Sequence, residues 1–244
     1  MGLHLGNLSE PTFEAGLIQR LGSLTDKRVL ELGCGLAPHA RLLSDFTQYY
    51  VAIDISWRKL ADCRIFGQSN TRYIICSDGI ALPFPDNSFD RVVLAHFIHE
   101  VDSSLQPMVM KEIQRVLIPE GKIIILDTTE KTIEFQKCFD IVHEDYQYYN
   151  HRFNLRHSKW LINKLMTRRM FLLEEKQKAS LDFHFSSIDQ IINILVEDFK
   201  YEYHFTQLEK EQISQSLKKV FKKKVTTNII INEQLDIYLL RNNK

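Results

Sequence analysis

Residues 28–40 read RVLELGCGLAPHA, and this stretch decides the fold. Residues 29–32 are mostly apolar, which is typical of a short strand buried in a parallel sheet. Gly33 and Gly35 follow, and because neither carries a Cβ they allow a sharp turn and a close approach of the backbone to a ligand. Pro38 then suits the first turn of a helix. The stretch predicts a strand, a tight loop and a helix.

Three interpretations of this loop are open. A dinucleotide-binding loop has the pattern G-x-G-x-x-G, but Pro38 stands where the third glycine is needed. The pattern acidic-x-G-x-G-x-G is met by Glu31, Gly33 and Gly35, with Ala37 in place of the last glycine. A strand-to-helix turn without a ligand is the third interpretation.

Composition is that of a globular protein, with 44% hydrophobic and 25% charged residues in a chain of 244. The formal net charge is zero but uneven, since residues 1–150 hold 14 Lys and Arg against 20 Asp and Glu, and residues 151–244 hold 17 against 11. The basic second part is compatible with an anionic partner, and equally with solvated helix faces.

The cysteines and the N-terminus indicate a cytoplasmic protein. The four cysteines are far apart and form no C-x-x-C pair, which favours reduced thiols over a disulfide or zinc framework. They are Cys34, Cys63, Cys76 and Cys138. Residues 1–10 lack the basic and apolar regions of a signal peptide, and no apolar run approaches the ~18 residues of a membrane span.

Carboxylates follow the next two predicted strands, residues 49–53 and 72–77. Asp54 comes 19 residues after Gly35, close to the ~20-residue offset at which an acid binds ribose hydroxyls in α/β folds. The alternative is a helix cap, because Asp54 and Ser56 precede a predicted helix at 57–66. Asp78 ends a strand at the same sheet edge and suits an adenine amino group.

Residues 81–90, ALPFPDNSFD, form a rigid turn that leads into a predicted strand at 91–95. A helix at 105–117, the turn IPEGK at 118–122 and a strand at 123–127 follow. Together with the glycine loop, these segments resemble class I S-adenosylmethionine-dependent methyltransferases. The turn at 81–90 is similar to that of the small-molecule superfamily that includes quinone-biosynthesis methyltransferases. The resemblance covers about residues 28–128, and Glu120 departs from it by replacing a glycine.

The resemblance implies an α/β fold. It is a Rossmann-like doubly wound sheet of seven strands, mostly parallel, with an antiparallel C-terminal hairpin and a helical lid insertion. The core would comprise residues 1–128 and 186–244, and the lid residues 129–185. Helical spacing at 135–149 and 158–174 supports the lid, and alternating patterns at 200–206 and 235–241 suit the hairpin. The cofactor implied is S-adenosylmethionine, with S-adenosylhomocysteine as product. The cofactor-binding residues are expected to be Glu31, Gly33, Cys34, Gly35, Asp54, Ile55, Ser77, Asp78, Gly79, Ala95 and His96.

The chemistry expected is in-line transfer of a methyl group to a small-molecule acceptor, which needs a general base only if the acceptor is protonated. His99 is the leading candidate for that base, because imidazole titrates near neutral pH. Tyr146, in an aromatic part of the lid, is a second catalytic candidate. A purely structural role is the alternative for each of them.

Other functions stay open at this point. The pattern H-x-x-H-E at 96–100 does not match H-E-x-x-H, so no metal is expected. A methyltransferase acting on RNA or protein is favoured only by the basic second part, and nucleic acid is not the expected partner. A scaffold that retains the fold without catalysis is the third hypothesis, since fold does not decide function. The sequence predicts no oligomeric state.

Overall fold

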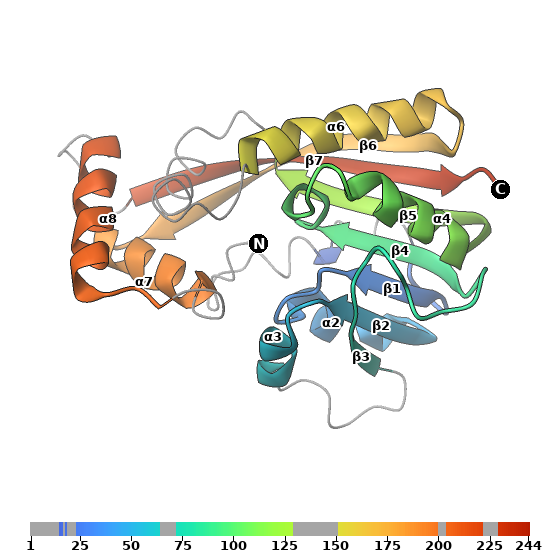
Figure 1. Cartoon of the computed structure of the whole chain (residues 1–244), viewed down its shortest axis with the longest axis horizontal. Helices are drawn as coiled ribbons and strands as arrows, with labels where there is room; N and C mark the ends of the chain where they lie inside the picture. The colour runs from blue at the N-terminus through green and yellow to red at the C-terminus, as the bar shows by residue number, and fades with distance from the viewer. Residues whose placement is uncertain are drawn as a thin grey trace.

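The computed structural model describes residues 15, 16, 18, 23–63, 72–128, 151–199, 204–221 and 229–244. A seven-stranded sheet in the order β3-β2-β1-β4-β5-β7-β6 forms its centre (Figure 1). The strands are β1 (Arg28–Leu32), β2 (Tyr49–Asp54), β3 (Arg72–Cys76), β4 (Phe89–Ala95), β5 (Leu117–Thr128), β6 (Phe171–Phe185) and β7 (Ile229–Asn242). Strands β1 to β5 pair in parallel, and β7 lies antiparallel between β5 and β6. The predicted fold class is confirmed.

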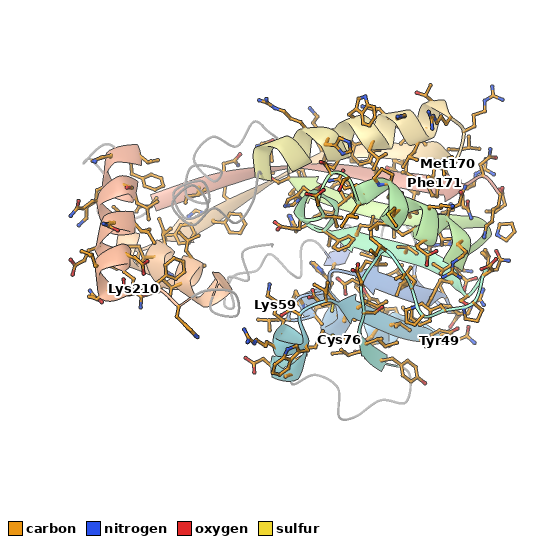
Figure 2. The ribbon with its side chains drawn as sticks, in the orientation of Figure 1. Tyr49, Lys59, Cys76, Met170, Phe171 and Lys210 are labelled. Carbon is orange, nitrogen blue, oxygen red and sulfur yellow. The ribbon has the colours of Figure 1, made fainter. Side chains whose placement is uncertain are left out.

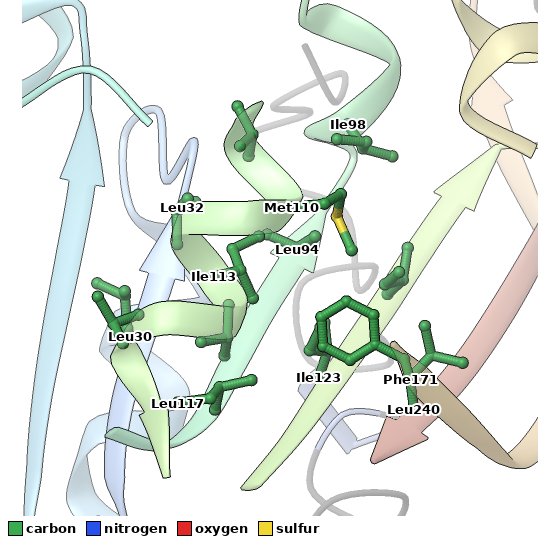
Figure 3. Packing of buried hydrophobic residues seen from close by; sticks show 14 of the residues in the cluster. Leu30, Leu32, Leu94, Ile98, Met110, Ile113, Leu117, Ile123, Phe171 and Leu240 are labelled. Carbon is green, nitrogen blue, oxygen red and sulfur yellow. The ribbon is translucent and has the colours of Figure 1, made fainter. Parts of the chain in front are cut away.

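Helices cover both faces of the sheet. On one face lie α4 (Gln106–Val116) and α6 (His151–Thr167), whose apolar side chains pack on β1, β4 and β5. Figure 3 shows Met110 and Ile113 of α4 among the buried side chains of these strands. On the other face lie α2 (Pro38–Leu43) and α3 (Trp57–Asp62). The apolar run of β1 is buried because both of its faces are covered, as expected of a parallel strand.

The chain order places a ligand site at one edge of the sheet. From β1 the chain proceeds outward through β2 to β3, and then returns to the other side of β1 with β4 and β5. Open α/β sheets bind ligands outside the carboxyl ends of the strands where the order reverses. Here that position lies above β1 and β4. Two 3₁₀ turns, η1 (Ser44–Phe46) and η2 (Ile98–Glu100), complete this half.

Strands β6 and β7 continue past the carboxyl end of β5 as a two-stranded ribbon. The last β5 pair is Thr128 with Leu235, whereas β6 and β7 remain paired as far as Phe185 and Ile229. Helices α7 (Ile188–Phe199) and α8 (Gln207–Val220) pack on this ribbon around a separate apolar cluster. Figure 2 shows Lys210 of α8 well away from Lys59 and Cys76 in the first half of the chain.

Part of the predicted lid was assigned wrongly. Helical spacing was expected over 158–174, but α6 ends at Thr167 and β6 begins at Phe171. Residues 171–185 of the predicted lid are therefore the outer strand of the sheet. The predicted strand at 200–206 is also wrong where it is described, because residues 204–206 have no strand pairing and Thr206 caps α8. The predicted helix at 135–149 lies outside the described residues.

Candidate functional site

The glycine loop after β1 has the backbone that its sequence predicts. Gly33 and Gly35 have φ angles of 69° and 56°, in the left-handed region where a side chain is strained. The amide of Cys34, between them, donates to the carbonyl of Ile53 on β2 at 3.0 Å. The loop is therefore fastened to the neighbouring strand at its centre.

Phe97 occupies the space over this loop, and sequence reasoning did not assign it to the site. A Cβ on Gly33 would lie 2.1 Å from Cδ2 of Phe97, and a Cβ on Gly79 would lie 3.4 Å from its Cζ. The ring thus lies between the loops that follow β1 and β3. One sequence feature could have pointed to Phe97. Gly33 and Gly79 follow the ends of β1 and β3, and Phe97 follows the end of β4.

Glu31 supports the glycine loop from within the core. It is 1% exposed, and its two carboxylate oxygens contact Nδ1 of His39 at 3.0 Å and the hydroxyl of Tyr50 at 3.2 Å. Burial, reinforced by the Glu31 charge, raises the pKa of Tyr50 well above its usual value, so Tyr50 is the donor. These contacts tie β1 to α2 and β2. A role of Glu31 toward a cofactor stays a prediction.

Asp54 joins the end of β2 to the glycine loop. Its Oδ2 accepts the amide of Gly35 at 2.8 Å, and its Oδ1 accepts the amide of Ser56 at 2.8 Å. The side chain of Ser56 accepts the amide of Lys59 and caps α3, which is the cap that the sequence offered as the alternative role of this segment. A carboxylate has about four acceptor sites. Among the described residues, two amides occupy two of the acceptor sites of Asp54.

The other predicted cofactor residues of β2 and β3 lie at the same edge. Ile55, directly after Asp54, is 69% exposed. The amide of Ser77 donates to the carbonyl of Asp54 at 3.1 Å, and Oδ1 of Asp78 accepts the amide of Ile80 at 3.1 Å. The carboxyl ends of β1, β2 and β3 therefore bring together an exposed apolar surface and two carboxylates that orient neighbouring amides.

The segment after β4 begins with a strained residue. Ala95 is buried, and His96 has a φ of 50°, unusual for a residue that carries a side chain. Its amide donates to the carbonyl of Leu126 on β5 at 2.8 Å. Such backbone strain persists where surrounding structure holds it, often at functional sites. His96 directly precedes Phe97, whose ring lies against the loops that follow β1 and β3.

His99 lies in a buried ionic cluster and does not face the sheet edge as a free base. It is 2% exposed; its Nδ1 contacts Oδ1 of Asp127 and its Nε2 lies 3.1 Å from Oε1 of Glu100. Burial lowers its pKa, but the charges and hydrogen bonds of Asp127 and Glu100 outweigh burial and raise the pKa to about 9. A histidine that is protonated at neutral pH has no lone pair with which to accept a proton. These contacts tie η2 to β5 and favour a structural role for His99, while its role as the general base stays a prediction.

The cysteines near the glycine loop and Tyr146 are the remaining residues to place. Burial raises the pKa of Cys34 far above its usual value and that of Cys63 to about 11, so both stay protonated and unreactive. Tyr146 lies outside the described residues. In the parts of the chain that the structure describes, no three metal-ligating side chains gather, and no helix is long and apolar enough to cross a membrane.

Comparison with known proteins agrees with this geometry. Residues 30–125 match the family model described as a methyltransferase domain. A demethylmenaquinone methyltransferase of Staphylococcus saprophyticus is 27% identical over 139 residues, which cover 53% of this chain and 57% of that protein. The chain spans about half the length of the curated relatives it matches.

Solved structures share the fold over most of the chain. A putative methyltransferase of Bacillus halodurans has a TM-score of 0.66 at 19% identity, covering 95% of this chain and 100% of that one. The N-methyltransferase NodS of Bradyrhizobium japonicum, in complex with S-adenosylhomocysteine, has a TM-score of 0.55 at 12% identity, covering 96% and 87%. At these identities the structures show the fold alone. Residues 30–125 of this chain are thus similar to a methyltransferase domain, and the strand order and the glycine loop agree with that similarity.

Proposed function

We propose that this protein binds S-adenosylmethionine across the carboxyl ends of β1, β2 and β3 and transfers its methyl group to a small-molecule acceptor. The observation that carries the proposal is the position of Asp54. Its carboxylate is held by the amides of Gly35 and Ser56, each at 2.8 Å, so it is oriented before any ligand arrives. A fixed carboxylate at this offset from a glycine loop suits a ribose diol.

The residues at the edge fit the parts of this cofactor. Gly33 and Gly35 carry no side chain and have left-handed φ angles, so the loop backbone can approach a ligand closely beside the ring of Phe97. The exposed side chain of Ile55 offers an apolar surface to an adenine ring, and Asp78 follows β3 where the adenine amino group would be expected. The complex of NodS with S-adenosylhomocysteine shows that a protein with this fold binds the product form.

The bound cofactor supplies an electrophilic methyl group on a sulfonium. The chain's own residues have to place the acceptor in line with that group and exclude water. In this proposal His99 has a structural role, which its contacts with Asp127 and Glu100 support. His96, at the strained turn after β4, is the described histidine next to the region where an acceptor would approach. Tyr146 stays a candidate on sequence grounds.

A quinone-type aromatic compound is the acceptor class to test first. The support is that matched relatives from several bacteria are named demethylmenaquinone methyltransferases. These matches cover between 30% and 53% of this chain. A cytoplasmic location belongs to the same proposal, and the free thiols of Cys34, Cys63 and Cys76 support it.

Calorimetric titration of S-adenosylmethionine and S-adenosylhomocysteine tests the cofactor. We expect the wild type to bind both, and Asp54→Ala to bind at least tenfold more weakly, a loss of ~1.4 kcal/mol or more. Asp62→Ala is the matched control, because it removes an exposed carboxylate from the nearby α3 and should leave affinity unchanged. Absence of binding to the wild type would refute the methyltransferase proposal. Binding without turnover of any tested acceptor would favour the scaffold hypothesis.

A further inference from the structure

Helix α6 divides sharply into a buried and an exposed side. Ser158, Leu161, Ile162 and Leu165 are at most 6% exposed and face the sheet. The opposite side is solvent-facing and carries the residues that we call the basic face of α6. These are Arg156, Trp160, Asn163, Lys164 and Thr167, followed by Arg168 and Arg169 just after the helix.

The charge of this face is of one sign. Between residues 151 and 173 the chain has six Lys and Arg and no Asp or Glu. One of the six, Lys159, lies at the edge of the buried side and pairs with Asp236 at 3.3 Å. Four of the other five, Arg156, Lys164, Arg168 and Arg169, belong to the basic face, and α6 itself carries no Asp or Glu. The face is therefore complementary to a dense negative surface.

Trp160 gives the basic face an aromatic residue at its centre. Its side chain is 51% exposed, and Nζ of Lys164 lies 4.2 Å from the ring centroid. One turn earlier, Nδ1 of His157 contacts Oε1 of Gln106 at 2.8 Å, which joins α6 to the beginning of α4. There Leu105 and Met108 are 36% and 48% exposed. Lys164 thus lies beside an exposed aromatic ring, and the end of α4 that His157 contacts carries two partly exposed apolar side chains.

We propose that the basic face of α6 docks this protein on an anionic lipid bilayer. Each Lys or Arg near a negatively charged membrane surface is attracted to the anionic lipids, and salt weakens this attraction. A half-exposed tryptophan suits the headgroup region of the bilayer. Because the apolar side of α6 is already buried against the sheet, the contact is peripheral and electrostatic, without insertion of the helix. Single-stranded RNA fits less well, since Lys164 covers one face of the ring on which a base would stack.

Vesicle binding by the full chain tests this proposal. The probes are vesicles of phosphatidylcholine alone and vesicles with about one-third phosphatidylglycerol, compared at low ionic strength. We expect at least tenfold tighter binding to the anionic vesicles, weakening as ionic strength rises to about 0.15 M, where the Debye length is ≈ 8 Å. In Trp57→Phe, Trp160 is the remaining tryptophan of two, and its emission should shift to the blue on anionic vesicles.

Paired charge reversals locate the contact. Arg168→Glu combined with Arg169→Glu should weaken binding to anionic vesicles at least tenfold. Lys218→Glu combined with Lys219→Glu makes the same change of charge on exposed positions of α8 and should leave binding unchanged. Equal binding to both kinds of vesicle, or equal losses in the two double variants, would overturn the proposal. So would tighter binding of a single-stranded RNA oligonucleotide than of anionic vesicles at the same ionic strength. None of these measurements depends on methyl transfer.

Discussion

His99 illustrates how a residue with a familiar catalytic side chain can be placed for stability. It lies 28 residues before Asp127 in the chain, and the ion pair between them joins the turn after β4 to the end of β5. Asp127 also accepts the amide of Thr128 at 3.0 Å, which orients its carboxylate. On the neighbouring strand, Asp127 lies opposite Asp236, whose own partner is Lys159 of α6. The positive charge on His99 therefore offsets one of two adjacent buried carboxylates.

We expect this ion pair to make stability depend on pH. The pKa of His99 is raised from 6.5 to about 9 in the folded chain. Below about pH 6.5 His99 is protonated in both the folded and the unfolded chain, and the contribution of the pair is complete. Between 6.5 and 9 the folded chain holds one more proton than the unfolded chain, so the contribution is lost as pH rises. The loss is roughly 3 kcal/mol in the free energy of unfolding.

Urea unfolding between about pH 6 and pH 9 measures this effect. The stability difference between the wild type and His99→Gln should shrink as the pH rises, because the wild type alone loses the charged pair. His184→Gln is the control, since His184 is exposed on β6. A difference between wild type and His99→Gln that stays constant across the range would contradict the assignment.

At the residue scale, the 19-residue spacing between Gly35 and Asp54 indicates that the carboxylate ends the strand beside the glycine loop, and its Oδ2 accepts the Gly35 amide there. The role of Asp54 toward a ribose stays a prediction. The partner of His99 could not be identified in this way. Whether a histidine is a base or an ion-pair member depends on burial and on a carboxylate from another strand, and neither leaves a mark in the local sequence.

Arg115 of α4 donates hydrogen bonds to the turn at residues 81–90, which resembles that of the small-molecule methyltransferases. Its guanidinium donates to the carbonyls of Leu82 and Phe84 at 3.0 and 2.7 Å and to Oδ1 of Asp86 at 3.0 Å. It also makes two contacts of 2.8 Å with Glu112, one turn earlier on the same helix. One planar group thus fixes the turn between β3 and β4 on the outer side of α4.

Replacing Arg115 by lysine should loosen this turn. A lysine ammonium cannot reproduce the fork that bridges Glu112 and two carbonyls at once, so we expect Arg115→Lys to cost about 1–3 kcal/mol in the free energy of unfolding. Arg168→Lys, the same change at an exposed position, should stay within about 0.5 kcal/mol. Urea denaturation of the two variants at neutral pH measures the difference. If both changed stability equally, the turn would not depend on the guanidinium.

The elements of the first half were predictable because each has a local signal. Strands β1, β2 and β4 are apolar runs bounded by turns, and α4 shows a one-sided pattern. Strand β6 has no such signal. Residues 174–178 in its first half are all polar, and β6 begins only four residues after α6 ends. Its pairing partner β7 begins 58 residues after β6 does. An outer strand that is covered less than a central one keeps a weaker alternation, so helical spacing was the wrong interpretation.

At the scale of the molecule, the protein has two regions that differ in strand pairing and in how fully helices cover the strands. Strands β1, β4 and β5 are paired on both sides and covered on both faces, whereas α7 and α8 pack on a ribbon of two strands beyond the sheet. Figure 1 shows these two helices at the far end of β6 and β7. Their cluster reaches the central sheet through Leu126 of β5. Local stability follows the number of buried contacts, so the two regions should open separately.

Hydrogen exchange measured by mass spectrometry tests this division. Amides of α7 and α8 should exchange sooner than those of β1, β4 and β5. Leu195→Ala removes a side chain that is 1% exposed in the α7–α8 cluster and should cost about 2–5 kcal/mol there. It should speed exchange in α7 and α8 and leave β1 and β4 unchanged. Ile113→Ala, in the cluster between α4 and the sheet, is the reciprocal control and should speed exchange in β4 and α4. A uniform increase across all peptides in Leu195→Ala would mean that the two regions unfold as one, because the ribbon then transmits the loss of packing to the central strands.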